Sequence, residues 1–340
     1  MYPKGTCQVS SLFREQIVKA VVIAALFLAG SLSAAFADNR LVGLSYSTIQ
    51  KKWNDAWGTP ALGPYSPNDK KVIEQHAKWI SDAGVDFIFL GWSNDLAYSP
   101  GCRCRPDIQR LEEATYTLVD SYQDLPKHPK VAIMIGFPFR DQASAPVDGR
   151  LQQKANQVYD DFIANKDRAP LYQFYEGKPL LIVYAGTPTP YKAGLPPWND
   201  PRFTVRYMTG FVSDQPSLLG PDRVSKYGYW SWEDRGPQTY TIRSGQPEAM
   251  TVTASWRGTK GRAPWRQVPG RSRMGGATFL DAWARAREKG VKLALVVSWN
   301  DWVKREQPSA EEGKDLEPSA EFGDFYLKLL KAQVTQFKAH

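Results

Sequence analysis

The 340-residue sequence predicts an α/β fold, a distorted (β/α)8 TIM barrel, on three observations. Its composition, 42% hydrophobic and 23% charged, is that of a globular protein with a sizeable core. Short apolar, β-rich runs alternate with longer stretches of helical period, which indicates a parallel sheet with crossover helices. The number of such runs is eight, as a closed barrel requires. No linker or repeat divides the chain, so we expect a single domain over residues 38–340.

The predicted strands come first in each unit and are rich in aliphatic and aromatic residues. They span residues 41–47, 86–93, 130–138, 179–185, 204–212, 226–232, 249–256 and 291–299.

The predicted helices are clearest towards the two ends of the chain. The first follows Asp69, a good N-cap, has apolar residues at helical spacing and ends at Gly84. The others span about 107–122, 149–165, 278–289 and 320–337. After the fourth, fifth and sixth strands the sequence has Pro-rich or polar loops, so we expect irregular units in the middle of the barrel.

The first 37 residues have the pattern of a secretory signal peptide. Lys4, Arg14 and Lys19 precede an uncharged run that ends in Ala35-Phe36-Ala37. Its most apolar part is shorter than the roughly 20 residues of a membrane span, so we expect cleavage before Asp38 and a secreted or periplasmic domain with no membrane attachment. An uncleaved N-terminal anchor is the alternative.

The basic residues are concentrated in one segment. The chain has a net charge of +8, and between Ser255 and Leu280 it has six basic and no acidic residues, with Trp256 and Trp265 interleaved. This pattern favours an anionic partner. For an exported protein an acidic polysaccharide fits better than nucleic acid, which we do not expect as a partner. A solvated loop is the alternative.

Cofactor and metal chemistry are not expected. Cys102 and Cys104 have no His nearby to complete a zinc site, and a short disulfide between them is the alternative use. The sequence has no nucleophile elbow and no phosphate-binding loop.

Aromatic residues cluster where the predicted strands end, which is where barrels of this kind place their sites. Large amphipathic rings stack on the faces of sugars, so carbohydrate is the expected ligand. Some of these rings are expected to be core residues instead. The candidate sugar-binding residues are Trp92, Asp95, Trp230, Trp232, Trp256, Arg257, Trp299, Asn300 and Trp302.

Carboxylates at the same ends suggest glycoside hydrolysis, which commonly needs a proton donor and a nucleophile or base. The catalytic candidates are Asp301 and Glu233, then Asp234 and Glu317. We expect Glu233 to donate the proton, because nearby tryptophans would disfavour its charged form, and Asp301 to be the ionised partner held by Asn300. Helix caps or surface ion pairs are the commoner use of single carboxylates.

The C-terminal motif resembles that of a known group of enzymes. The run Ser298-Trp299-Asn300-Asp301-Trp302, then Leu316-Glu317-Pro318 and Phe322-Gly323, is similar to the end of glycoside hydrolase families 71 and 99, the α-1,3-glucanase and endo-mannosidase relatives. Weaker similarity lies around Asp69, His76 and Trp79 and at 177–184.

The resemblance implies a (β/α)8 barrel that cleaves glycans without a cofactor. It implies that Asn300 and Asp301 contact sugar or act in catalysis, and that Glu317 is the acidic residue of the last loop. Family 99 proteins also carry essential Glu residues after the third strand. Residues 135–140 here contain none, and Asp141 is the carboxylate nearby. The family 99 mechanism therefore does not carry over.

These observations favour an exported glycoside hydrolase acting on a polysaccharide, with an acidic polymer preferred. The alternative is a catalytically inactive carbohydrate-binding or polysaccharide-biosynthesis accessory protein on the same fold. A nucleic-acid binder that uses the basic segment is a weaker third hypothesis.

Overall fold

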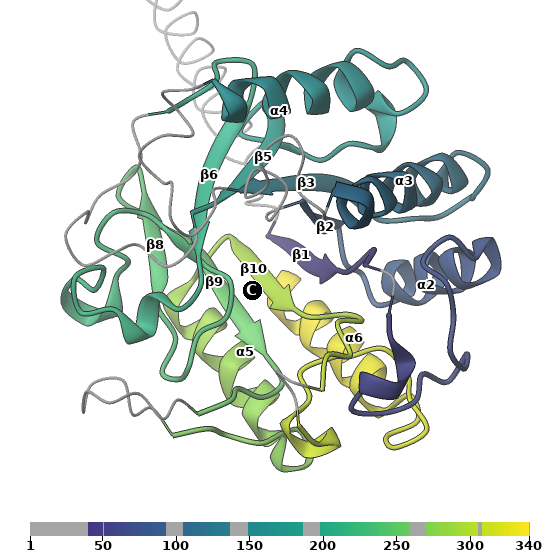
Figure 1. Cartoon of the computed structure of the whole chain (residues 1–340). Helices are drawn as coiled ribbons and strands as arrows, with labels where there is room; N and C mark the ends of the chain where they lie inside the picture. Colours follow the sequence, from purple (N-terminus) through teal and green to yellow (C-terminus); the bar gives the residue numbers. More distant parts are fainter. Residues whose placement is uncertain are drawn as a thin grey trace, which may run out of the picture. The chain divides into compact units, whose positions relative to one another are not determined.

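In the part of the chain that the computed structural model describes, eight parallel strands form a barrel, and helices pack outside part of it (Figure 1). The structure describes residues 40–49, 51–92, 105–136, 149–185, 198–258, 269–304 and 308–339, with the backbone alone at 105–108. The parallel strands lie in the order β7-β6-β5-β3-β2-β1-β10-β9. They are β1 (Leu41–Tyr46), β2 (Phe87–Trp92), β3 (Lys130–Gly136), β5 (Lys178–Tyr184), β6 (Thr204–Thr209), β7 (Trp230–Ser231), β9 (Gln246–Thr253) and β10 (Leu293–Val297).

Each parallel strand falls within or overlaps a predicted one, so the predicted barrel is confirmed. β7 is only two residues long. Side chains bridge the gap between β7 and β9, the two ends of the parallel sheet. The Thr251 hydroxyl on β9 donates to the Ser231 carbonyl on β7, and Trp230 Nε1 lies 3.3 Å from Glu248 Oε2. These contacts make the barrel nearly closed.

Two short strands were not predicted. β4 (Phe174–Tyr175) pairs antiparallel with β5, and β8 (Tyr240–Arg243) pairs antiparallel with β9. β8 stands where a regular barrel has a helix, and the chain between β6 and β7 has only short 3-10 turns. The expected irregularity of these middle units is confirmed for the residues that the structure describes.

The helices lie outside the strands. They are α2 (Lys70–Asp82), α3 (Arg105–Tyr122), α4 (Arg150–Val158), α5 (Ala277–Lys289) and α6 (Phe325–Lys338). Asp69 caps α2 as expected, since its side chain accepts from the backbone N–H of Lys71. Gly84 follows the helix with a φ of +81°, which a residue with a side chain rarely adopts.

The last helix begins later than predicted. Residues 320–324 are not helical, because Ser319 and Gly323 form a tight turn with backbone hydrogen bonds of 2.8 and 3.1 Å. The helix therefore starts only at Phe325.

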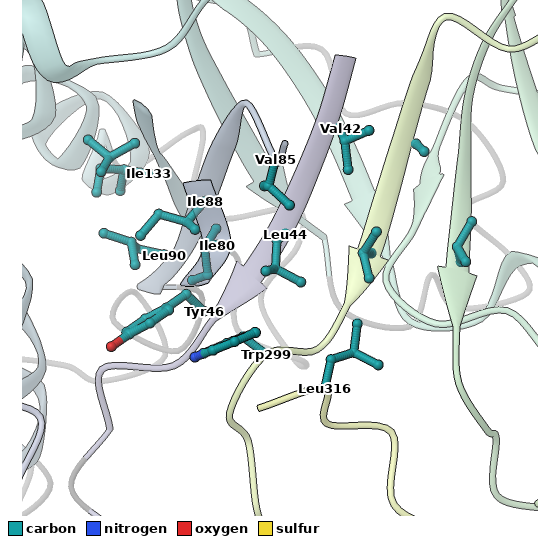
Figure 2. Close-up of a cluster of buried hydrophobic side chains, with 14 of the residues drawn as sticks. Val42, Leu44, Tyr46, Ile80, Val85, Ile88, Leu90, Ile133, Trp299 and Leu316 are labelled. Carbon is teal, nitrogen blue, oxygen red and sulfur yellow. The ribbon is translucent and has the colours of Figure 1, made fainter. Parts of the chain in front are cut away.

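Alternating side chains of the strands build two separate apolar layers. On β2, Phe87 and Phe89 belong to a cluster inside the barrel, whereas Ile88 and Leu90 pack towards the helices. Figure 2 shows part of the outer layer, in which Ile88 and Leu90 lie with Leu44 and Ile80. Gly43 on β1 leaves room for the Phe87 ring, because a Cβ there would lie 2.4 Å from Phe87 Cζ.

Candidate active site

A cavity of about 520 Å³ opens at the carboxyl ends of the parallel strands. This volume is in the range of small-molecule sites, and the place is where barrels of this architecture carry their sites. Its wall is built from residues near or after the carboxyl ends of all eight parallel strands. They include Ser45, Ser47, Gly91, Met134, Tyr184, Phe211, Trp232, Glu233, Arg235, Arg257, Ser298, Asp301 and Lys314.

Two of the four catalytic candidates, Glu233 and Asp301, line this cavity. Glu233 follows β7, and its backbone N–H donates to the Gly210 carbonyl at 3.0 Å. Asp301 follows β10. Their side chains are 7% and 19% exposed, so both are largely shielded from water yet reach the cavity.

Lys314 holds these two carboxylates together. Its Nζ lies 3.1 Å from Glu233 Oε2 and 3.9 Å from Asp301 Oδ2. The two oxygens are therefore at most about 7 Å apart, a limit that allows the separation of about 5–5.5 Å found in retaining glycosidases. Lys314 is itself 5% exposed. Sequence analysis missed it, because a lysine between a glycine and an aspartate has the pattern of a surface loop.

Asp315, also missed, fixes the loop that carries Asp301. Its Oδ1 accepts from the Asp301 N–H at 2.6 Å and the Ser298 hydroxyl at 2.5 Å. Its Oδ2 accepts from the Trp302 N–H and the Trp57 indole, both at 2.8 Å. Burial raises the pKa of Asp315, and the neighbouring Asp301 charge raises it further, while the hydrogen bonds from Ser298, Trp57 and the Trp302 N–H oppose the rise.

Lys51 supplies a further cation at the end of β1. Its Nζ donates to Ser47 Oγ, on the cavity wall, at 2.6 Å. Burial lowers the pKa of Lys51, and the carboxylates of Asp301 and Asp315 partly compensate for this.

The other two catalytic candidates are enclosed by structural partners and do not line the cavity. Glu317 accepts from Tyr65 at 2.8 Å and Trp302 Nε1 at 2.7 Å, and lies 2.9 Å from His76 Nε2. Asp234 accepts from Ser231 Oγ at 2.6 Å and from the backbone N–H groups of residues 213 and 239. These contacts hold the loops that carry the two carboxylates, and a catalytic role for Glu317 and Asp234 stays a prediction from the sequence.

Asn300 also has a structural position. Its Oδ1 accepts from the Ser47 N–H at 2.8 Å, and its Nδ2 donates to the Ser47 carbonyl at 3.1 Å. It therefore joins the ends of β1 and β10 and positions Ser47. Sequence analysis expected Asn300 to hold Asp301, and in the structure Asp315 accepts from the backbone N–H of Asp301.

Trp232 is the one candidate tryptophan that lines the cavity, where its ring packs edge-on against Phe89 at 5.9 Å. Five other candidates are at most 9% exposed and lie within the packed structure: Trp92, Trp230, Trp256, Trp299 and Trp302. Figure 2 shows Trp299 among the buried aliphatic side chains. These five tryptophans are therefore core residues, as sequence analysis expected for some of the rings.

Two arginines lie on the same wall as Glu233. Arg257 was a candidate, and Arg235 was missed because it follows the acidic pair Glu233-Asp234 and is expected to balance it. Instead, Arg235 Nη1 pairs with Asp214, Nε donates to the Arg257 carbonyl at 2.6 Å, and the guanidinium lies 3.7 Å from the centre of the Phe211 ring.

Several expectations lie outside the described residues. These are the signal peptide, Asp95, Cys102, Cys104, Asp141 and basic residues 260, 262 and 266. Within the described ranges, no three metal-ligating side chains come together, and no helix has the length and apolarity of a membrane span.

The eight parallel strands with a cavity at their carboxyl ends have the architecture of a distorted (β/α)8 barrel. No family model and no curated protein matches the sequence. In structure, the chain is similar to a GH99 endo-α-mannosidase from Bacteroides thetaiotaomicron, with a TM-score of 0.58, 15% identity, and coverage of 88% of this chain and 97% of that chain.

Two further structures agree. A second structure of the GH99 endo-α-mannosidase from Bacteroides thetaiotaomicron has a TM-score of 0.57 and 16% identity, covering 89% of this chain and 98% of that one. A glycoside hydrolase-like protein has a TM-score of 0.54 and 15% identity, covering 87% and 94%. The fold implied by the C-terminal motif is therefore confirmed. At these identities the likeness concerns the fold, and the chemistry must be argued from the site.

Proposed function

We propose that this protein is an exported glycoside hydrolase that cleaves a polysaccharide with Glu233 and Asp301, in a secreted or periplasmic location. The observation that carries the proposal is the placement of Glu233 and Asp301 on one cavity wall, joined by Lys314. Trp232 on the same wall supplies an aromatic face for a sugar ring. The export part rests on the N-terminal sequence pattern.

The contact with Lys314 leads us to exchange the roles expected from the sequence. An ammonium group at 3.1 Å stabilises a negative charge on Glu233, so Glu233 is the nucleophile or the base that activates water. Asp301, at 3.9 Å from the ammonium and more exposed to the cavity, donates its proton to the leaving glycosidic oxygen. If Glu233 is the nucleophile, water then displaces it from the anomeric carbon and gives its proton to Asp301. If Glu233 is the base, it takes the proton of the attacking water, and both carboxyl groups return to their starting states by proton exchange with solvent.

The first experiment is an assay of the purified protein against neutral and acidic bacterial polysaccharides, with new reducing ends as the readout. Cleavage of one polymer is expected. Binding of a polymer with no new reducing ends from any of them would contradict hydrolysis. That outcome would favour the accessory-protein alternative, in which Lys314 keeps Glu233 in a permanent ion pair.

The second experiment separates the two roles. On the polymer, Glu233→Gln and Asp301→Asn are each expected to lower kcat at least about 100-fold. On a dinitrophenyl glycoside, whose leaving group needs no protonation, Asp301→Asn is expected to recover most of its activity and Glu233→Gln is not. The matched control is Glu288→Gln on the exposed face of α5. Recovery by Glu233→Gln instead would reverse the assignment.

A further inference from the structure

Arg235 is held in a fixed position on the cavity wall. Its side chain is 6% exposed, and the Phe211 ring, Asp214 and the Arg257 carbonyl fix the plane of its guanidinium. These contacts use Nε and Nη1. Among the described residues no acceptor binds Nη2, and the residue lines the cavity. The rigid fork therefore keeps donor capacity for a ligand without having to be ordered when the ligand binds.

Arg257 lies next to this guanidinium, since its carbonyl accepts from Arg235 Nε at 2.6 Å. Arg257 is an exposed residue and lines the same cavity. Both arginines thus line one cavity, and Glu233 precedes Arg235 by two residues in the chain. Lys314 contacts the carboxylates of Glu233 and Asp301, whereas Arg235 pairs with Asp214, so the two arginines belong to a separate part of the wall.

Neutral sugars need hydroxyl and carboxylate partners and an aromatic face, which Trp232, Glu233 and Asp301 already provide. A pair of guanidinium groups matches the geometry of a planar or tetrahedral anion far better than that of a hydroxyl.

We propose that Arg235 and Arg257 form a subsite for an anionic group carried by a sugar next to the cleavage point. The ligand class is a glycan with a uronic-acid carboxylate or a phosphate or sulfate ester. That the ligand is a glycan rests on the proposed function. The subsite itself rests on the arginine geometry, which sequence analysis had sought in the basic segment from 255 to 280 rather than at Arg235.

The test uses calorimetric binding of oligosaccharides from one uronic-acid polymer before and after chemical reduction of its carboxyl groups. The wild-type protein is expected to bind the charged form at least about tenfold more tightly than the reduced form, with an affinity that falls as salt is added. Phosphorylated and sulfated oligosaccharides form two further arms. The arm that binds most tightly identifies the anion.

The variant Arg257→Gln removes one guanidinium from an exposed side chain, so the fold is not at risk. It is expected to weaken binding of the charged oligosaccharide about tenfold and leave the reduced one unchanged. Arg243→Gln is the matched control, because Arg243 is an exposed arginine at the end of β8, distant from the cavity lining. It is expected to change neither affinity.

The outcomes separate this subsite from the hydrolase proposal. Tight, Arg257-dependent binding without cleavage would leave the subsite standing and overturn hydrolysis. Cleavage of neutral glycans with no preference for charge and no effect of Arg257→Gln would leave hydrolysis standing and overturn the subsite. Equal affinity for the charged and reduced oligosaccharides would also overturn it.

Discussion

The ammonium of Lys314 donates to the carboxylate of Glu233 at 3.1 Å, although 81 residues separate them in the chain. Both side chains are almost fully buried, and Asp301 completes the group at 3.9 Å. This contact joins the loop after β7 to the loop after β10, and it brings together the two carboxylates on which the proposed chemistry depends.

Replacing Lys314 is expected to cost both stability and activity. Lys314→Met leaves two buried carboxylates without their cation, which typically costs about 3–5 kcal/mol. Urea unfolding measures the loss, and the double variant Lys314→Met/Glu233→Gln should recover part of it. Lys328→Met, which removes an exposed pair with Asp324, is the control and should change stability by less than about 0.5 kcal/mol. An equally small effect of Lys314→Met would show that the contact of Lys314 with the two carboxylates does not stabilise the fold.

Glu317 is expected to act through structure rather than chemistry. Glu317→Gln places an amide where the carboxylate accepts from Tyr65 and Trp302. The free energy of unfolding should fall by about 2–3 kcal/mol, with activity falling as the loops loosen. Glu233→Gln, in contrast, should lower activity because it removes the proposed reacting carboxylate. The ion pair with Lys314 is the main contact that this variant loses. If Glu317→Gln abolishes turnover while the melting temperature and near-UV circular dichroism stay at wild-type values, a direct catalytic role would be restored.

Two tryptophans near the end of β7 should behave oppositely. Trp232→Ala removes a ring from the cavity wall and is expected to weaken glycan binding about tenfold at a small cost in stability. Trp230→Ala empties a site that is 1% exposed and should destabilise the protein by about 3–5 kcal/mol. Titration calorimetry and urea unfolding on both variants test this. Unchanged affinity in Trp232→Ala would remove that ring from the binding site.

Lys51 is expected to make the free energy of unfolding depend on pH in the alkaline range. Burial lowers its pKa in the folded state, whereas the unfolded value is about 10.4. At a pH between the folded-state pKa and the unfolded-state pKa, the folded state binds fewer protons than the unfolded state. The free energy of unfolding should therefore rise with pH in this range.

Lys51→Met should lack this component of the rise. The measurement is urea unfolding from pH 7.5 to 10.5, with Lys52→Met, at the exposed neighbouring position, as the control. Parallel curves for Lys51→Met and the wild-type protein would contradict the prediction.

The sequence alone determined the eight barrel strands, the helices at both ends of the chain and the irregular middle. These follow from local patterns, since an apolar run, an Asp69 cap or a Gly84 stop acts on residues next to it in the chain. It also identified Glu233 and Asp301 as candidates, because carboxylates that follow parallel strands gather at one end of a barrel.

Only the tertiary structure decided which of these groups meet. A tryptophan at a strand end has the same local pattern whether it faces the cavity, as Trp232 does, or packs beneath the loops, as Trp299 does. Lys314 and Arg235 have no local signal, because their roles come from partners on distant loops. The physical reason is that burial and pairing of charges depend on distances in space, which the closing of the barrel sets.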